Sequence, residues 1–169
     1  MAQKAITIYT PTDTPPHIYA EDDAQVHRAL IGDSGITLAD DLLACTVVNG
    51  NTVRLASGVY SVQGYLICVQ GGTTADLAVE SGMAGSYRHD LVVADFVRGG
   101  GSVADQITFK VIRGADATSE GAAADPALTQ QDLRTGGTQR QEALYRLLIN
   151  GTAIGGVERV ANYIGNIYQ

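Results

Sequence analysis

Between Leu42 and Arg113, short runs of alternating hydrophobic and polar residues are separated by glycines, a pattern typical of β-strands joined by tight turns. Val53 and Leu55 fall on one face of such a run, and Asn49-Gly50-Asn51 before it predicts a hairpin. The strands expected from this pattern are Leu42–Val48, Thr52–Ala56, Val59–Val69, Asp76–Glu80, Tyr87–Val97 and Gln106–Arg113.

Two of these runs depart from simple alternation. Tyr87–Val97 carries apolar residues at consecutive positions, so both faces are hydrophobic, and such a strand is buried between layers or at a subunit interface. Val59–Val69 contains Gly64 in its interior, which indicates a β-bulge or a close approach of another backbone.

One short helix is expected before the strands, over Ala20–Ile31. Three acidic residues lie at its start, where the helix dipole favours negative charge, and Gly32 ends it. Val26, Leu30 and Ile31 fall on one face of this helix.

The region after Arg113 is less regular. Gly114–Gln141 is polar and rich in alanine and glycine, which predicts a long surface loop with a helical turn near Thr129–Leu133. Leu144–Asn150 has leucines at helical spacing, yet Asn150-Gly151 is a hairpin signal, and we favour a strand.

The expected fold class is mainly β: an antiparallel β-sandwich or barrel-like module with a short N-terminal helix and an extended N-terminal arm. The arm spans residues 1–19, and a single β-rich domain spans 20–169. Ala5–Tyr9 (AITIY) is a short β-prone run in the arm, and three prolines end it: Pro11, Pro15 and Pro16.

Composition narrows the function classes. The chain has 169 residues and a net charge of −7, which argues against binding to nucleic acid and to anionic membranes, since both need clustered Lys and Arg. The N-terminus lacks the apolar core of a signal peptide, and no run approaches the ~18 apolar residues of a membrane helix. We therefore expect synthesis and folding in the cytoplasm. Cys45 and Cys68 lie in apolar runs, so buried thiols are expected, with a disulfide between neighbouring strands left open.

The sharpest catalytic candidate is Gly32-Asp33-Ser34-Gly35, which resembles the serine-nucleophile segments of chymotrypsin-like proteases and GDSL-type esterases. The protease segment continues with Gly-Pro, whereas Ile36-Thr37 follows here. The esterase type has a histidine near the C-terminus, and none follows His89. A turn is the expectation for this segment.

The other candidates are weaker. In a strand, His89 and Asp90 point to opposite faces, so Ser86, His89 and Asp90 are expected as partly exposed strand-entry residues. Acidic residues and histidines around the helix (His17, Glu21, Asp22, Asp23, His27) lack the spacing of a helical metal site. Gly71-Gly72 and Gly99–Gly101 match no phosphate loop and predict turns. No catalytic, metal or cofactor-binding residue is therefore assigned, and no cofactor is expected. The eight scattered tyrosines leave sugar binding open.

Several sequence segments, taken in order, resemble segments of the structural proteins of siphophage-type phage tails and baseplates. They are Gly58–Tyr65, the R-x-D-x-V-V strand at Arg88–Val93, Ile107–Gly114, Asp125–Thr129 and the closing hairpin Leu144–Ile154. The succession covers residues 21–160.

The resemblance implies a non-enzymatic virion subunit, often encoded in prophages of Gram-positive bacteria. Such proteins form β-rich modules, commonly homotrimers, that contact other tail or baseplate proteins and attach receptor-binding parts. From the β-prone run and the proline spacing of residues 1–16, we expect this part of the arm to dock on a neighbouring subunit or tail protein. This chain is short and has no long C-terminal fibre or lectin head, which argues against receptor binding by the chain itself. The alternative function is that of a carbohydrate-binding module that recognises a bacterial surface glycan.

Overall fold

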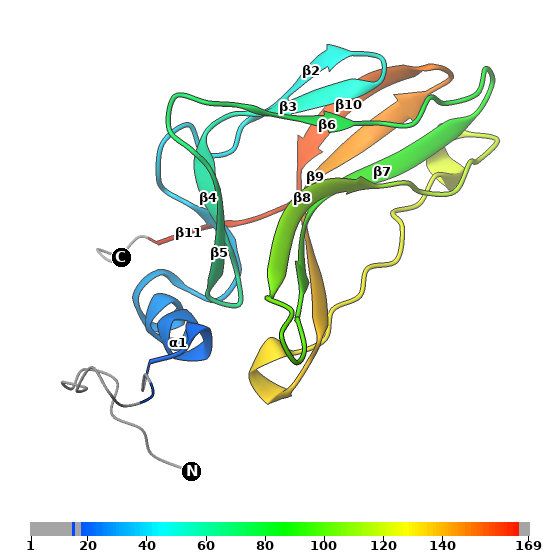
Figure 1. Ribbon diagram of the computed structural model, residues 1–169. Coiled ribbons are helices and arrows are strands. Elements are labelled where there is room, and N and C mark those ends of the chain that lie inside the picture. Colours follow the sequence, from blue (N-terminus) through cyan, green and yellow to red (C-terminus); the bar gives the residue numbers. More distant parts are fainter. Residues whose placement is uncertain (1–14, 16–17, 166–169) are drawn as a thin grey trace.

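The computed structural model describes Pro15 and residues 18–165 of the chain. The described part is mainly β, with one α-helix near its start and three small sheets that do not close into a barrel (Figure 1). Nearly all strand pairs are antiparallel, so the expected sandwich-like fold class is confirmed. The expected strand at Ala5–Tyr9 and most of the proposed arm lie outside the described residues. Within the described part, no helix is long and apolar enough to cross a membrane.

The largest sheet has the strand order β10-β9-β7-β8. Its central strand β7 (Tyr87–Val97) is paired along both edges and is buried on both faces, as the unbroken apolar run predicts. Its other members are β8 (Gln106–Ile112), β9 (Gln139–Asn150) and β10 (Ala153–Arg159).

The second sheet has the order β11-β1-β4-β5, and it corrects the expected single strand over Val59–Val69. That run forms two strands joined by a two-residue turn at Gln63-Gly64, where both residues have positive φ. Because hydrophobic residues flank the turn on both sides, the sequence pattern resembles one continuous strand. The strands are β1 (Gly35–Thr37), β4 (Gly58–Val62), β5 (Tyr65–Val69) and β11 (Tyr163–Ile164), the last pairing in parallel with β1.

The third sheet has the order β2-β3-β6 and contains the expected hairpin around Gly50. Val53 and Leu55 are fully buried, as their alternation predicts. The neighbouring β2 starts at Cys45, later than expected, because Leu42 and Leu43 adopt positive φ and break the strand. The three strands are β2 (Cys45–Asn49), β3 (Thr52–Leu55) and β6 (Ala75–Ala78).

The helix α1 spans Ala20–Ile31, with the bounds expected from the sequence, and its C-cap is Gly32. Its orientation is the reverse of an ordinary amphipathic helix. Asp22 and Ala24 are buried, whereas Val26 is 36% and Leu30 60% exposed. The apolar stripe of α1 therefore points away from the protein.

The polar segment after β8 is a long connection, as expected, with 3-10 turns η1 (Glu120–Ala122) and η2 (Leu133–Thr135). Two details differ from the expectation. The helical turn spans Leu133–Thr135 and so overlaps the expected Thr129–Leu133 only at Leu133, and β9 already begins at Gln139. The strand expected over Leu144–Asn150 and the hairpin at Gly151 are confirmed.

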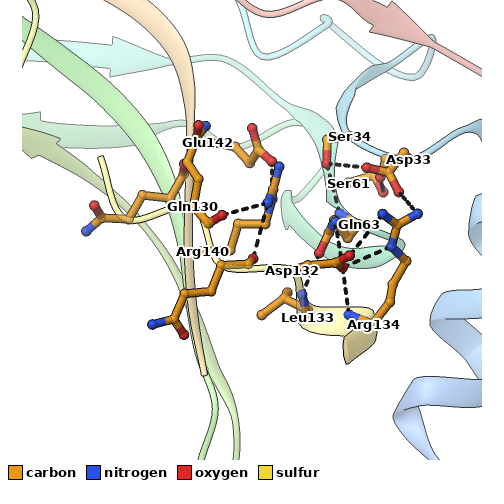
Figure 2. Close-up of polar contacts among 12 residues, drawn as sticks. Asp33, Ser34, Ser61, Gln63, Gln130, Asp132, Leu133, Arg134, Arg140 and Glu142 are labelled. Carbon is orange, nitrogen blue, oxygen red and sulfur yellow. Dashed lines mark hydrogen bonds and ion pairs between the residues drawn. The ribbon is translucent and has the colours of Figure 1, made fainter. Parts of the chain in front are cut away.

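β9 contains one extra residue relative to β7. Val92 pairs with Tyr145 and Val93 pairs with Ala143, so Leu144 is skipped in the register. Both Leu144 and Tyr145 belong to the hydrophobic core. The skipped residue exchanges the two faces of β9 on its N-terminal side. Arg140 and Glu142 therefore point toward the second sheet instead of away from it (Figure 2).

One continuous core joins the three sheets and α1. Its buried members include Val53 of β3, Tyr60 of β4, Phe96 of β7 and Leu147 of β9. Ala24 of α1 and Ala161, between β10 and β11, extend it to the two ends of the described chain.

Candidate functional site

The Gly32–Gly35 segment forms the connection between α1 and β1 and is held by hydrogen bonds to β4 and its turn (Figure 2). The Ser34 hydroxyl donates to the Asp33 carboxylate at 3.4 Å and accepts from the backbone N–H of Gln63 at 3.0 Å. Ser61 donates its hydroxyl to the Asp33 carbonyl at 2.9 Å. These contacts fix a turn, as the sequence predicts for this segment.

A serine nucleophile needs a histidine base within hydrogen-bond reach, and the described histidines have other partners. His27 Nδ1 lies 2.7 Å from the carbonyl oxygen of Gly64. His89 Nδ1 lies 3.1 Å from Asp125 Oδ1, on the largest sheet. His17 falls outside the described residues. The structure thus places neither described histidine on the Ser34 hydroxyl.

Gln63 connects three segments that are distant in sequence. Its side-chain oxygen accepts from the backbone N–H of Leu133 at 2.8 Å, and its amide nitrogen donates to Asp132 Oδ1 at 3.2 Å. Its backbone carbonyl accepts from Arg28 of α1 at 2.6 Å. Gln63 is only 2% exposed, so this polar group is buried with its hydrogen bonds satisfied.

Asp132 is the acidic centre of the same network. It accepts hydrogen bonds from the side chain and the backbone N–H of Arg134, and these contacts lower the pKa of Asp132 to about 2. Arg134 also lies 3.7 Å from Asp33 in the turn before β1. The network therefore ties the α1–β1 turn to the η2 turn before β9.

Arg140 and Glu142 form a second polar group, on β9. Arg140 pairs with Glu142 and also donates to the carbonyl oxygens of Gln130 and Gln131 (Figure 2). Every charge described here has a partner within the protein, and the arrangement provides positioning but no unpaired acid or base. We call the set Asp33, Ser34, Gln63, Asp132, Arg134, Arg140 and Glu142 the polar clamp.

Sequence reasoning missed a second polar pair, Arg88 and Asp90. Both side chains are almost fully buried, and Asp90 accepts two hydrogen bonds from Arg88, at 2.8 and 2.9 Å. Asp90 also accepts from the backbone N–H of Gly114, and Arg88 donates to the carbonyl of Glu80. The expectation of partly exposed side chains is wrong for Asp90 and also for Ser86, which is buried. Residues two apart on a strand share a face, so Asp90 lies beside Arg88 on the buried face and pairs with it.

A small pocket of about 100 Å³ lies on the opposite face of the largest sheet. Tyr87, His89, Glu120 and Asn150 line it with polar groups, and Leu148 adds an apolar side. Asp125 contacts both His89 and Arg146 beside it, and these contacts lower the pKa of Asp125. The pocket combines one aromatic ring with several hydrogen-bonding groups.

The remaining candidates lie apart from the polar clamp. Asp22 accepts a hydrogen bond from the Tyr19 backbone at the start of α1, and no group of three or more metal-ligating side chains occurs in the described part of the chain. Gly71-Gly72 and Gly99–Gly101 lie in turns between strands, as expected. The tyrosines are dispersed: Tyr60, Tyr65 and Tyr145 are buried, whereas Tyr19 and Tyr163 are exposed.

Both cysteines are free thiols. Cys45 is partly buried, and loss of solvent raises its pKa to about 11. Cys68 is exposed, which corrects the expectation of two buried thiols: its strand β5 is an edge strand, covered on one face only.

Comparison of the chain with models of known protein families, with curated proteins and with solved structures gave no match. The case for a function therefore rests on the geometry described above and on the sequence resemblance.

Proposed function

We propose that this chain is a non-enzymatic structural subunit of a phage tail or baseplate, which assembles with copies of itself and with neighbouring tail proteins. In this proposal the chain is made in the host cytoplasm and resides in the virion, where it attaches receptor-binding parts. The ordered sequence resemblance provides the phage context, and the surface of the fold provides the physical argument for assembly.

The observation that carries the proposal is the reversed orientation of α1. The helix turns Asp22 and Arg28 toward the protein, while Val26 and Leu30 remain exposed. These two residues are four positions apart, so they lie side by side on one face of the helix. Covering these exposed apolar side chains with another protein removes them from water, which is favourable. We propose that a further copy of this chain covers them.

The assembly test uses the full chain and light scattering. The wild-type chain is expected to form a homo-oligomer, a trimer by the resemblance. The double variant V26E/L30E is expected to shift the mass to that of a monomer while the circular dichroism spectrum stays unchanged. M83E is the control, since Met83 is as exposed as Leu30 but lies outside α1. A wild-type monomer, or an oligomer that survives V26E/L30E, contradicts self-assembly through α1.

A separate test addresses the phage context. Particles purified after prophage induction of the strain that carries the gene are expected to contain the chain in a fixed ratio to a tail-tube protein. Mass spectrometry of gradient-purified particles measures that ratio. Absence of the chain from intact tails contradicts the virion location.

The pocket at Tyr87 favours a second candidate function, recognition of a bacterial surface glycan. An aromatic ring beside His89, Glu120 and Asn150 offers stacking and hydrogen bonds to a sugar. A glycan array is expected to give a signal that Y87A abolishes and Y163A, at an exposed tyrosine elsewhere, retains. Equal loss in both variants, or no signal from the wild-type chain, counts against this candidate.

A further inference from the structure

A groove of about 320 Å³ separates α1 from the strands β5 and β8. Its apolar lining consists of Tyr65, Leu66, Phe96 and Ile107, and Asp23 and Asp105 add carboxylates. Ala20, the first residue of α1, also lines the groove, so the chain enters the described fold at this groove.

Two strand edges border the groove. Within the described part of the chain, β8 pairs only with β7, and β5 pairs only with β4. β8 is the longer of the two, with seven residues against five. An unpaired edge presents a row of backbone N–H and C=O groups that can hydrogen-bond an added strand. Ile107 of β8 lines the groove itself, so a strand added there would place side chains against the apolar lining.

The sequence before α1 contains one segment suited to that position, Ala5–Tyr9. It is β-prone, it has no proline, and Ile6 and Ile8 fall on one face at the period of a strand. The eleven residue steps from Tyr9 to Ala20 span at most roughly 36 Å when extended. β8 is about 23 Å long, so the segment can reach its edge.

Charge favours the same pairing. Lys4 puts a positive group next to Ala5–Tyr9, and residues 1–9 contain no acidic side chain. The groove carries Asp23 and Asp105, and Glu21 lies within 3.8 Å of Arg98, which also pairs with Asp105. The segment and the groove therefore have opposite charge around an apolar centre.

We propose that Ala5–Tyr9 of this chain adds as a strand to the open edge of β8, with Ile6 and Ile8 seated in the groove between α1 and β5. Backbone hydrogen bonds provide the affinity, and the two isoleucines fix the register, as in other cases of strand addition. This inference does not depend on the phage context or on the exposed stripe of α1.

Amide hydrogen exchange of the full chain tests the proposal. Every second backbone amide of β8 faces its open edge, and these amides are expected to exchange slowly in the wild-type chain. The double variant I6E/I8E should speed their exchange by about tenfold or more, because the added strand is lost. T10E/T12E, with the same added charge just outside the segment, is the matched control and should retain the protection.

Three outcomes overturn the proposal: fast exchange of these amides in the wild-type chain, protection that persists in I6E/I8E, or equal loss in both variants. K4E should weaken the protection at low salt and less so at high salt, and no salt dependence contradicts the charge argument.

Light scattering on the same samples tells which copy delivers the segment. A mass that falls in I6E/I8E but not in the control indicates exchange between copies, and an unchanged mass indicates docking within one chain. V26E/L30E alters neither Ala5–Tyr9 nor the edge of β8, so failure here is distinguishable from failure of assembly through α1.

Discussion

Arg88 and Asp90 show what the alternation of a strand reveals about single residues. The pattern over Tyr87–Val97 predicts correctly that the strand is buried and that His89 and Asp90 face opposite ways. It does not predict that a charged pair occupies the buried face, because residue type alone favours exposure for both groups. The signal was present in the spacing, since residues two apart on a strand lie side by side.

Removing the Arg88 side chain is expected to destabilise the protein strongly. R88M leaves the Asp90 carboxylate buried with only the Gly114 N–H as its described partner, and breaking a buried pair in this way costs about 3–5 kcal/mol. Urea unfolding measures the change. The double variant R88M/D90L should recover part of the loss, since no charge then remains buried.

Arg54 provides the matched control for that measurement. It forms a comparable bidentate pair with Asp76, at 2.6 and 2.8 Å, but both side chains are exposed. R54M should leave the urea midpoint close to that of the wild-type chain. Similar losses in R54M and R88M would show that burial is not what makes the Arg88 pair important.

Asp132 gives a prediction for pH dependence. Its pKa is lowered to about 2 in the folded chain, so its carboxylate stabilises the fold above the unfolded pKa of about 4. That contribution is lost as the pH falls toward 2. D132N should therefore be less stable than the wild-type chain at pH 6, with a difference that shrinks between pH 4 and 2. Urea midpoints at each pH measure it, with D40N, outside the polar clamp, as the control.

The turn at Gln63-Gly64 determines how the elements meet. The pattern predicts α1 with its observed bounds, and it marks Gly64 as either a β-bulge or a point of close backbone approach, of which the second is found. It could not reveal that the approaching backbone is α1 itself, because the contact joins residues forty positions apart. The carbonyls of Gln63 and Gly64 contact Arg28 and His27, so the tip of the β4–β5 hairpin binds the polar side of the helix.

Substitution of Gly64 should loosen this junction. A Cβ at Gly64 would lie 2.1 Å from the Ala24 carbonyl oxygen, and the residue has φ of +89°. Gly72 is a matched control, with φ of +76° and no atom within 4 Å of a Cβ. G72A should lose roughly 1 kcal/mol from backbone strain alone, and G64A more, with faster amide exchange in α1. Equal losses would show that the helix contact contributes nothing.

At the scale of the whole molecule, the fold class was predictable but the joining of its parts was not. Short alternating runs identify strands, yet they contain no information on which sheet a strand enters. The polar clamp illustrates the limit, because Asp33, Gln63 and Asp132 come from separate loops with no shared motif. The sequence of the α1–β1 turn resembles serine-nucleophile segments of proteases and GDSL-type esterases, whereas its contacts hold the turn to β4 and to Gln63.

The common core predicts that the three sheets unfold together. Leu55 belongs to the smallest sheet, is fully buried and is part of the cluster that contains Phe96 of the largest one. L55A should therefore lower the free energy of unfolding of the whole chain by about 2–5 kcal/mol. Far-UV and near-UV circular dichroism should report one coincident transition. Two separate transitions would mean that the small sheet folds independently.

Leu144, the residue skipped in the register, divides β9 into two parts that contact the second sheet in different ways. Above it, Tyr145, Leu147 and Ile149 of β9 close the space between the sheets with hydrocarbon. On its N-terminal side, the reversed faces direct Arg140 and Glu142 toward the second sheet, and this ion pair adds to the hydrophobic contact between Phe96 and Tyr65. Deleting Leu144 would restore the regular alternation and exchange the two faces of β9 between Gln139 and Ala143. The length of the chain at this single position thus decides whether Arg140 and Glu142 face the second sheet or point away from it.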